Sequence, residues 1–71
     1  MQQQPDRAAH EAREIDEVIQ RLQDRFPDTD HDRIRAAVTD AHRLFEGRPI
    51  RDFVPVFVER AARTALAAPP A

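Results

Sequence analysis

The sequence of 71 residues contains no Cys, Ser, Lys, Tyr, Trp or Asn and only one Gly. Without cysteine, neither a disulfide framework nor a thiolate metal site can form. Most residues that serve as covalent nucleophiles are absent too, which leaves only threonines and carboxylates, and none of these lies in a recognisable catalytic setting. We therefore predict that the chain is not an enzyme.

Long apolar runs are also lacking. The longest spans residues 53–58 and is interrupted by Pro55, whereas a membrane-spanning helix needs about 20 apolar residues. The first five residues are polar and do not resemble a secretory signal peptide. All 11 cationic side chains are Arg and are mixed with 13 carboxylates, a balance that does not favour general nucleic-acid binding. We expect a cytoplasmic protein.

Apolar residues at helical spacing predict three helices, at about residues 7–26, 30–46 and 53–67. Pro27 should end the first helix, because a residue before proline is pushed out of the helical conformation. Gly47 lies where a left-handed cap would end the second helix. The prediction is an all-α three-helix bundle over residues 7–67, with disordered tails at 1–6 and 68–71.

Two helix starts carry candidate caps. Thr29 is followed three residues later by Asp32, which approximates a capping box for the second helix. The segment 53–58 is rich in β-branched and aromatic residues, so propensity alone would also allow a strand. Pro55 favours a helix instead, because proline is tolerated in a first helical turn but removes a donor from a central strand. We expect Asp52 to be the N-cap of this third helix.

The third helix carries more apolar residues than one face can bury. The surplus either widens the core or meets a partner, and the short chain favours a partner because small domains often need oligomerisation, disulfides or a metal for stability. We therefore predict protein binding, most simply homodimerisation through this helix. The candidate interface residues are Ile50, Phe53, Val54, Val56, Phe57 and Leu66.

No metal or cofactor site is predicted. Residues 28–32 place carboxylates at alternate positions, as in a calcium loop, but the sixth position is Arg33 rather than Gly and the twelfth is Thr39 rather than Glu. His10 and His42 each precede a glutamate by four residues, a spacing that supports only weak metal ligation. We interpret the acidic cluster as favouring a helix N-terminus.

Several stretches resemble a known family. These are Arg25-Phe26-Pro27, then Ile34, Val38, Ala41 and Phe45, then residues 50–60 with Ala62-Arg63. Over about residues 15–66 the chain is similar to a small actinobacterial three-helix-bundle dimerisation domain, found alone or ahead of arsenate-reductase-like and low-molecular-weight phosphatase-like domains. The resemblance implies a homodimer. Because this sequence has no cysteine for such chemistry, any link to it would act through a separate arsenate-reductase-like or phosphatase-like protein.

Two alternative functions remain open. Leu22, Phe26-Pro27, Ile34 and Leu66 are similar to the pattern of CUE-type ubiquitin-binding domains, although Ala65-Leu66 stands where two leucines are expected. A helix-turn-helix DNA-binding domain is the other alternative, because four arginines lie on or before the third helix. Against it, the first turn of that helix, which should meet base edges, is apolar. The four arginines are Arg48, Arg51, Arg60 and Arg63.

Overall fold

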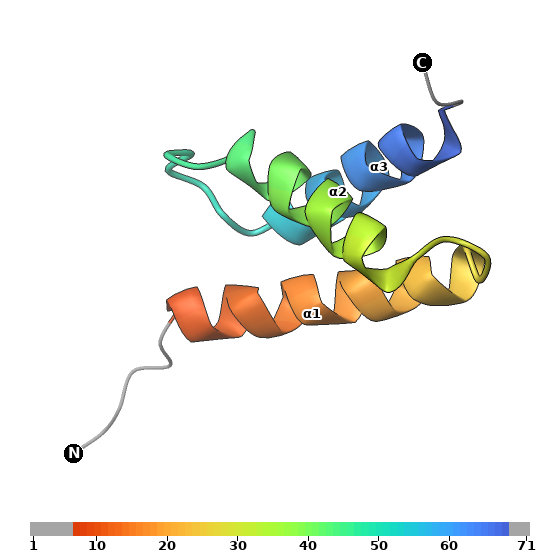
Figure 1. Cartoon of the computed structure of the whole chain (residues 1–71). Coiled ribbons are helices and arrows are strands. Elements are labelled where there is room, and N and C mark those ends of the chain that lie inside the picture. Colours follow the sequence, from red (N-terminus) through yellow and green to blue (C-terminus); the bar gives the residue numbers. More distant parts are fainter. Residues whose placement is uncertain (1–6, 69–71) are drawn as a thin grey trace.

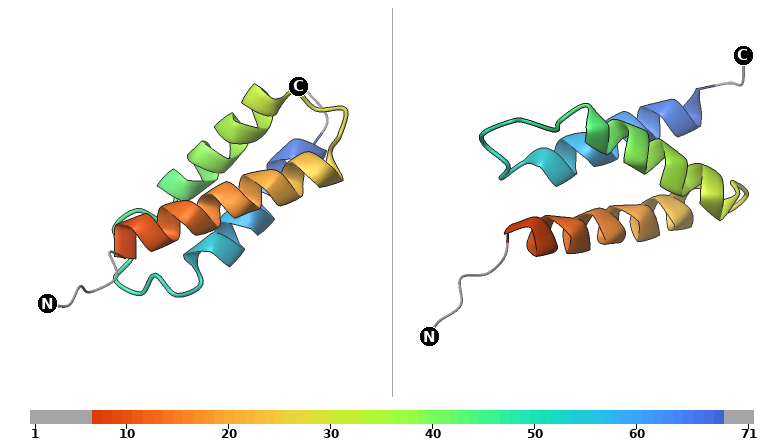
Figure 2. Two further views of the ribbon diagram at one scale, coloured as in Figure 1. Left: turned by 90° about the horizontal axis from the view of Figure 1, so that it is seen from below. Right: turned by 60° about the vertical axis from the view of Figure 1, so that its left-hand side comes forward.

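The computed structural model describes residues 7–68, which form three α-helices: α1 (Arg7–Arg25), α2 (His31–Arg43) and α3 (Val54–Ala67). No strand occurs in this range, so the predicted all-α three-helix bundle is confirmed, as is the choice of helix over strand near Pro55. The helix α1 forms one layer, and α2 and α3 lie together across it as a second layer (Figures 1 and 2). The predicted N-terminal tail and most of the C-terminal tail fall outside the described residues.

The core lies where the three helices meet. Each helix contributes one apolar stripe with the spacing of three and four residues that places side chains on one face. The largest fully buried side chains include Leu22 of α1, Ile34 of α2 and Val58 of α3. The buried core residues are Ile15, Val18, Leu22, Ile34, Val38, Ala41, Val54, Val58 and Ala62. In α3 the buried stripe therefore runs from Val54 to Ala62, and it leaves Phe57, the aromatic residue of that helix, outside the core.

The two predicted N-caps are both wrong by one residue. The backbone N–H of Ile34 donates to the carbonyl of Asp30 at 3.1 Å, so α2 begins after Asp30 and not after Thr29. The N–H of Phe57 likewise donates to the carbonyl of Phe53 at 3.1 Å, which makes Phe53 the N-cap of α3 in place of Asp52. Neither N-cap side chain accepts a hydrogen bond from the helix it precedes.

The helix α2 ends earlier than residue 46 because its hydrogen-bonding pattern changes. After Arg43 the N–H groups of Leu44 and Phe45 donate to carbonyls three residues back, at 3.1 and 3.0 Å, instead of four. Gly47 then adopts a φ of 85°, the left-handed conformation predicted for it. Residues 44–53 form a loop that returns the chain to the start of α3, at the end of the bundle where α1 begins (Figure 1).

An ion pair joins α1 to α3 on one side of the bundle. The guanidinium of Arg21 donates hydrogen bonds from Nε and Nη2 to the Glu59 carboxylate, the shortest being 2.8 Å. These bonds lower the pKa of Glu59, and they connect α3 to α1 beside the buried stripe. Among the described residues, no helix is both long and apolar enough to cross a membrane.

Candidate interaction surface

Five large apolar side chains lie exposed at one end of the bundle, where the 44–53 loop meets the first turn of α3. Their exposed fractions range from 42% to 72%. We call this set the apolar patch; it consists of Leu44, Ile50, Phe53, Val56 and Phe57. Single exposed apolar residues are ordinary, but a group of them at one site marks a binding surface or an aggregation hazard.

The structure divides the predicted interface residues into two groups. Ile50, Phe53, Val56 and Phe57 belong to the apolar patch, so they are available to a partner. Val54 is only 2% exposed and is part of the core, because its side of α3 faces the other two helices, a direction that helical spacing alone does not give. Leu66 is half-buried and packs against the core at the opposite end of α3.

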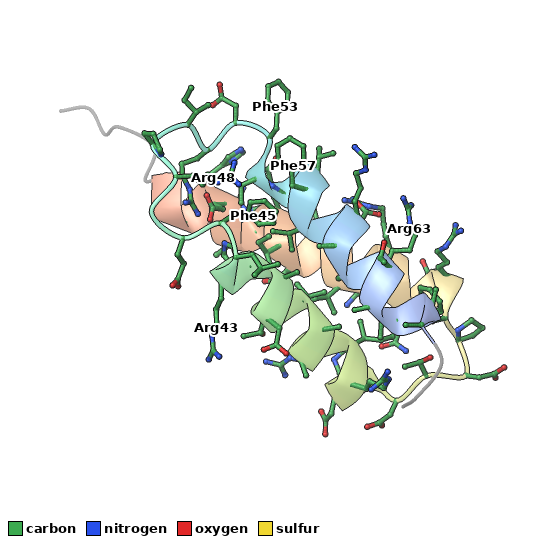
Figure 3. The ribbon with its side chains drawn as sticks, turned by 90° about the horizontal axis from the view of Figure 1, so that it is seen from above. Arg43, Phe45, Arg48, Phe53, Phe57 and Arg63 are labelled. Carbon is green, nitrogen blue, oxygen red and sulfur yellow. The ribbon has the colours of Figure 1, made fainter. Side chains whose placement is uncertain are left out.

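Among the loop residues, Ile50 and Phe53 were predicted to lie at this surface, but Leu44 and Phe45 at the start of the loop were missed. Leu44 falls within the range predicted for the second helix, but it lies just beyond Arg43, where the chain tightens into turns, and it is 69% exposed. Phe45 stacks on Phe57 with ring centroids 5.9 Å apart, and the guanidinium of Arg48 lies 5.1 Å from the Phe45 ring centroid. Figure 3 shows these side chains together with Phe53 near the start of α3. The change from regular helix to turns after Arg43 carried no clear sequence signal.

A cluster around Glu11 holds the loop against α1. Arg51 donates to the Glu11 carboxylate from Nε at 2.9 Å and from Nη2 at 2.6 Å, and its Nη1 donates to the carbonyl of Phe45 at 2.7 Å. His42 Nε2 lies 2.6 Å from Glu11 Oε2, which requires a proton on that ring nitrogen. Arg51 therefore connects α1 to the backbone of the residue that stacks on Phe57.

The electrostatics of this cluster are those of a stable ion pair. Hydrogen bonds from Arg51 lower the pKa of Glu11 from 4.5 to about 2, although burial of the carboxyl opposes the shift, and His42 contributes further lowering. The same bonds raise the pKa of Arg51. Glu11 is accordingly ionised at neutral pH. Its carboxylate accepts two charge-assisted hydrogen bonds from Arg51, and these bonds position the loop.

A shallow hollow beside the Glu11 cluster is lined by His10, Glu11, Glu14, Arg51 and Asp52. Within residues 7–68, no group of three or more His, Asp or Glu side chains is arranged to hold a metal ion. His10 pairs with Glu14 at 3.6 Å, and His42 is directed to Glu11 and not to Glu46 as its spacing suggested.

The residues behind the alternative functions are partly engaged within the bundle. Phe26, one of the residues that carry the resemblance to CUE-type domains, is partly buried and packs against the core. Arg51, one of the four arginines considered for DNA binding, is bonded to Glu11. Val54 and Pro55 are buried in the first turn of α3, the turn that would have to meet base edges. None of these observations favours either alternative.

Comparison with known proteins finds no matching family model, no similar curated protein and no similar solved structure.

Proposed function

We propose that this chain is a non-catalytic protein-binding module that forms a homodimer through the apolar patch. The observation that carries the proposal is the gathering of five large apolar side chains, each at least 42% exposed, at one end of a very small domain. Burying such side chains against a partner contributes about 25 cal/mol per Å² of apolar surface. The resemblance of the sequence to a dimerisation domain supports the same function.

The small core favours a partner. Nine buried residues form the core, and domains of this size commonly gain stability from disulfides, metals or oligomerisation. The sequence contains no cysteine, so disulfide stabilisation is excluded. Association with a second copy buries additional apolar surface and requires neither a metal ion nor another protein.

The charges around the patch favour a second copy of the chain over a partner protein that is strongly acidic or strongly basic. The 44–53 loop carries the exposed residues Glu46, Arg48 and Asp52, while its other cation, Arg51, is bonded to Glu11. Both signs are therefore present at the rim. Two copies can pair opposite charges at such a rim, whereas a strongly basic or acidic partner would meet repulsion as well as attraction.

Phe53→Asp tests the proposal without damaging the monomer. Phe53 is exposed and is the N-cap of α3, a position where Asp is among the preferred residues. The substitution should therefore leave the monomer as stable or slightly more stable, while a charge placed in the apolar interface weakens dimerisation by several kcal/mol. Sedimentation equilibrium of wild type and variant measures the effect.

Val56→Asp provides a second, independent substitution in the patch. Val56 lies in the first turn of α3, where the helix dipole favours a carboxylate, so the monomer should again remain folded. Ala12→Asp on the exposed surface of α1 is the matched control and should not change the dimer. If both patch variants dimerise as tightly as wild type, the patch is not the dimer interface.

A further inference from the structure

The exposed side of α3 carries opposite charges at equal spacing on either side of an apolar residue. Asp52 precedes Val56 by four residues and Arg60 follows it by four, and all three are exposed. Residues four apart lie on the same side of a helix, about 6 Å from each other along its axis. We call this set the outer stripe; it consists of Asp52, Val56 and Arg60.

Asp52 belongs to this side of α3 although it lies before the first residue of the helix. The N–H of Val54 donates to the carbonyl of Arg51 at 3.1 Å, and Phe53 between them has a φ of −109° and a ψ of 10°. These angles are near those of a type I turn, whose central residues are close to the helical conformation. The backbone therefore enters α3 along nearly the helical path.

The outer stripe faces away from the other two helices. At about 100° per residue, Val56 lies roughly 160° around α3 from Val58, which is completely buried. Arg63 lies about 20° from Val56 by the same count, and Figure 3 shows its side chain on the edge of α3 that is turned away from α2. A second chain can therefore approach this side of α3 directly.

The carboxylate of Asp52 is not engaged within the bundle. Among the ion pairs of residues 7–68, none includes Asp52. The two cations nearest to it in the sequence are directed elsewhere, since Arg51 is bonded to Glu11 and Arg48 lies over an aromatic ring of the loop. A cation from outside the bundle can therefore pair with this carboxylate.

The guanidinium of Arg60 is likewise available. No ion pair within the described part of the chain includes it, and no carboxylate lies three or four positions away from it on α3. Its neighbour Glu59 is bonded to Arg21 of α1. The outer stripe thus presents one available anion and one available cation, with Val56 midway between them.

From this pattern we infer that the homodimer pairs α3 of the two copies in opposite directions, with Val56 on the twofold axis and Asp52 of each copy facing Arg60 of the other. The inference rests on the proposed homodimer and specifies its register. A twofold axis at Val56 places the residue four positions before it opposite the residue four positions after it in the partner. Parallel pairing would bring like charges together.

The same register brings the two apolar patches together. Around α3, Phe53 lies about 60° and Phe57 about 100° from Val56, both in the same direction. A twofold axis perpendicular to an antiparallel helix pair keeps that direction the same in both copies. The phenylalanines of the two copies therefore gather along one edge of the helix pair, and one interface both buries the patch and pairs the charges of the outer stripe.

Charge reversal tests the register. Asp52→Arg or Arg60→Glu alone would create two contacts between like charges, and we expect each to raise the dimer dissociation constant about tenfold or more. The double variant Asp52→Arg/Arg60→Glu restores opposite charges, so its dissociation constant should return to within about threefold of wild type. Arg33→Glu, exposed in the first turn of α2, is the matched control and should change nothing. Sedimentation equilibrium at low salt measures all four variants.

The absence of cysteine allows an independent test at the twofold axis. Packed helices have axes about 8 to 10 Å apart and Cα atoms about 2.3 Å from each axis, so the two facing Val56 Cα atoms should lie about 5 Å apart. Disulfides span Cα separations of about 4.4 to 6.8 Å. Val56→Cys should therefore form a disulfide-linked dimer in a glutathione buffer, detected by non-reducing electrophoresis. Ala12→Cys, exposed on α1, is the control and should stay mostly unlinked.

The outcomes separate the register from the dimer itself. A dimeric wild type whose affinity is unchanged by both single charge reversals would overturn this register and leave the proposed function standing. A double variant weaker than either single variant, or a Val56→Cys variant that links no better than Ala12→Cys, would overturn the register too. A monomeric wild type would overturn the proposed function and this inference together.

Discussion

Glu11 and Arg51 lie 40 residues apart in the sequence and form a bidentate ion pair, with contacts of 2.9 and 2.6 Å. The pair fastens the 44–53 loop, which carries Leu44, Ile50 and Phe53 of the apolar patch, to the first half of α1. Because Arg51 also donates to the carbonyl of Phe45, the same guanidinium fixes the residue that stacks on Phe57. The shape of the patch therefore depends on a contact with a helix that contributes no residue to it.

Removing the charge of Glu11 should destabilise the fold. Glu11→Gln keeps the size of the side chain but weakens the bonds from Arg51 and His42, and we expect a loss of about 1 to 2 kcal/mol in the free energy of unfolding. Chemical denaturation measures it. Glu14→Gln is the control, since Glu14 is more exposed and its ion pair within the described residues is with His10, at 3.6 Å. Equal stability of the two variants would show that the cluster does not hold the fold.

The same carboxyl predicts a pH dependence. The pKa of Glu11 is about 2 in the folded chain against 4.5 ordinarily, so the unfolded chain binds more protons in acid. The stabilisation from Glu11 is fully present above about pH 4.5 and is lost progressively as the pH falls toward 2. The stability difference between wild type and Glu11→Gln should therefore shrink between pH 6 and pH 3. A constant difference over that range would contradict the assignment.

Two leucines provide a matched test of the core. Leu22 is 1% exposed, whereas Leu44 is 69% exposed. Leu22→Ala should cost about 2 to 5 kcal/mol, because it leaves a cavity among packed side chains. Leu44→Ala should change the stability of the monomer by less than about 0.5 kcal/mol, measured by thermal unfolding at the lowest workable concentration. Similar losses would place Leu44 in the core and remove it from the patch.

Gly47 should resist substitution for conformational reasons alone. Its φ is 85°, and a Cβ built at this position meets no atom within 4 Å. Gly47→Ala should therefore cost about 1 kcal/mol through backbone strain, while Gly47→Asn should cost less because Asn tolerates the left-handed conformation. Thermal unfolding of the two variants makes the comparison. An Ala variant as stable as wild type would mean that the loop adopts another conformation.

The helices were predictable because their signals are local. Spacings of three and four residues located all three, and Gly47 indicated the left-handed turn after α2. The helix starts were missed by one residue, since the choice between Asp52 and Phe53 depends on which carbonyl accepts the first helical hydrogen bond. That choice is made by the packing of the loop and not by the capping preference of a side chain.

The surface was predicted less completely than the fold. Four of the candidate interface residues are exposed, but Val54 is in the core because the helical wheel gives no absolute direction for the buried face. The ion pair of Glu11 with Arg51 had no sequence signal, since nothing local relates two residues 40 positions apart. Contacts of this kind follow from the way the helices cross.

The molar mass of the wild-type chain over a concentration series tests the central claim most directly. Sedimentation equilibrium from about 1 to about 500 μM covers the affinities typical of an interface of this size. We expect the weight-average mass to rise from 8.2 kDa toward twice that value, and the melting temperature to rise with concentration. A mass that stays at 8.2 kDa throughout, with a melting temperature independent of concentration, would contradict self-association through the apolar patch.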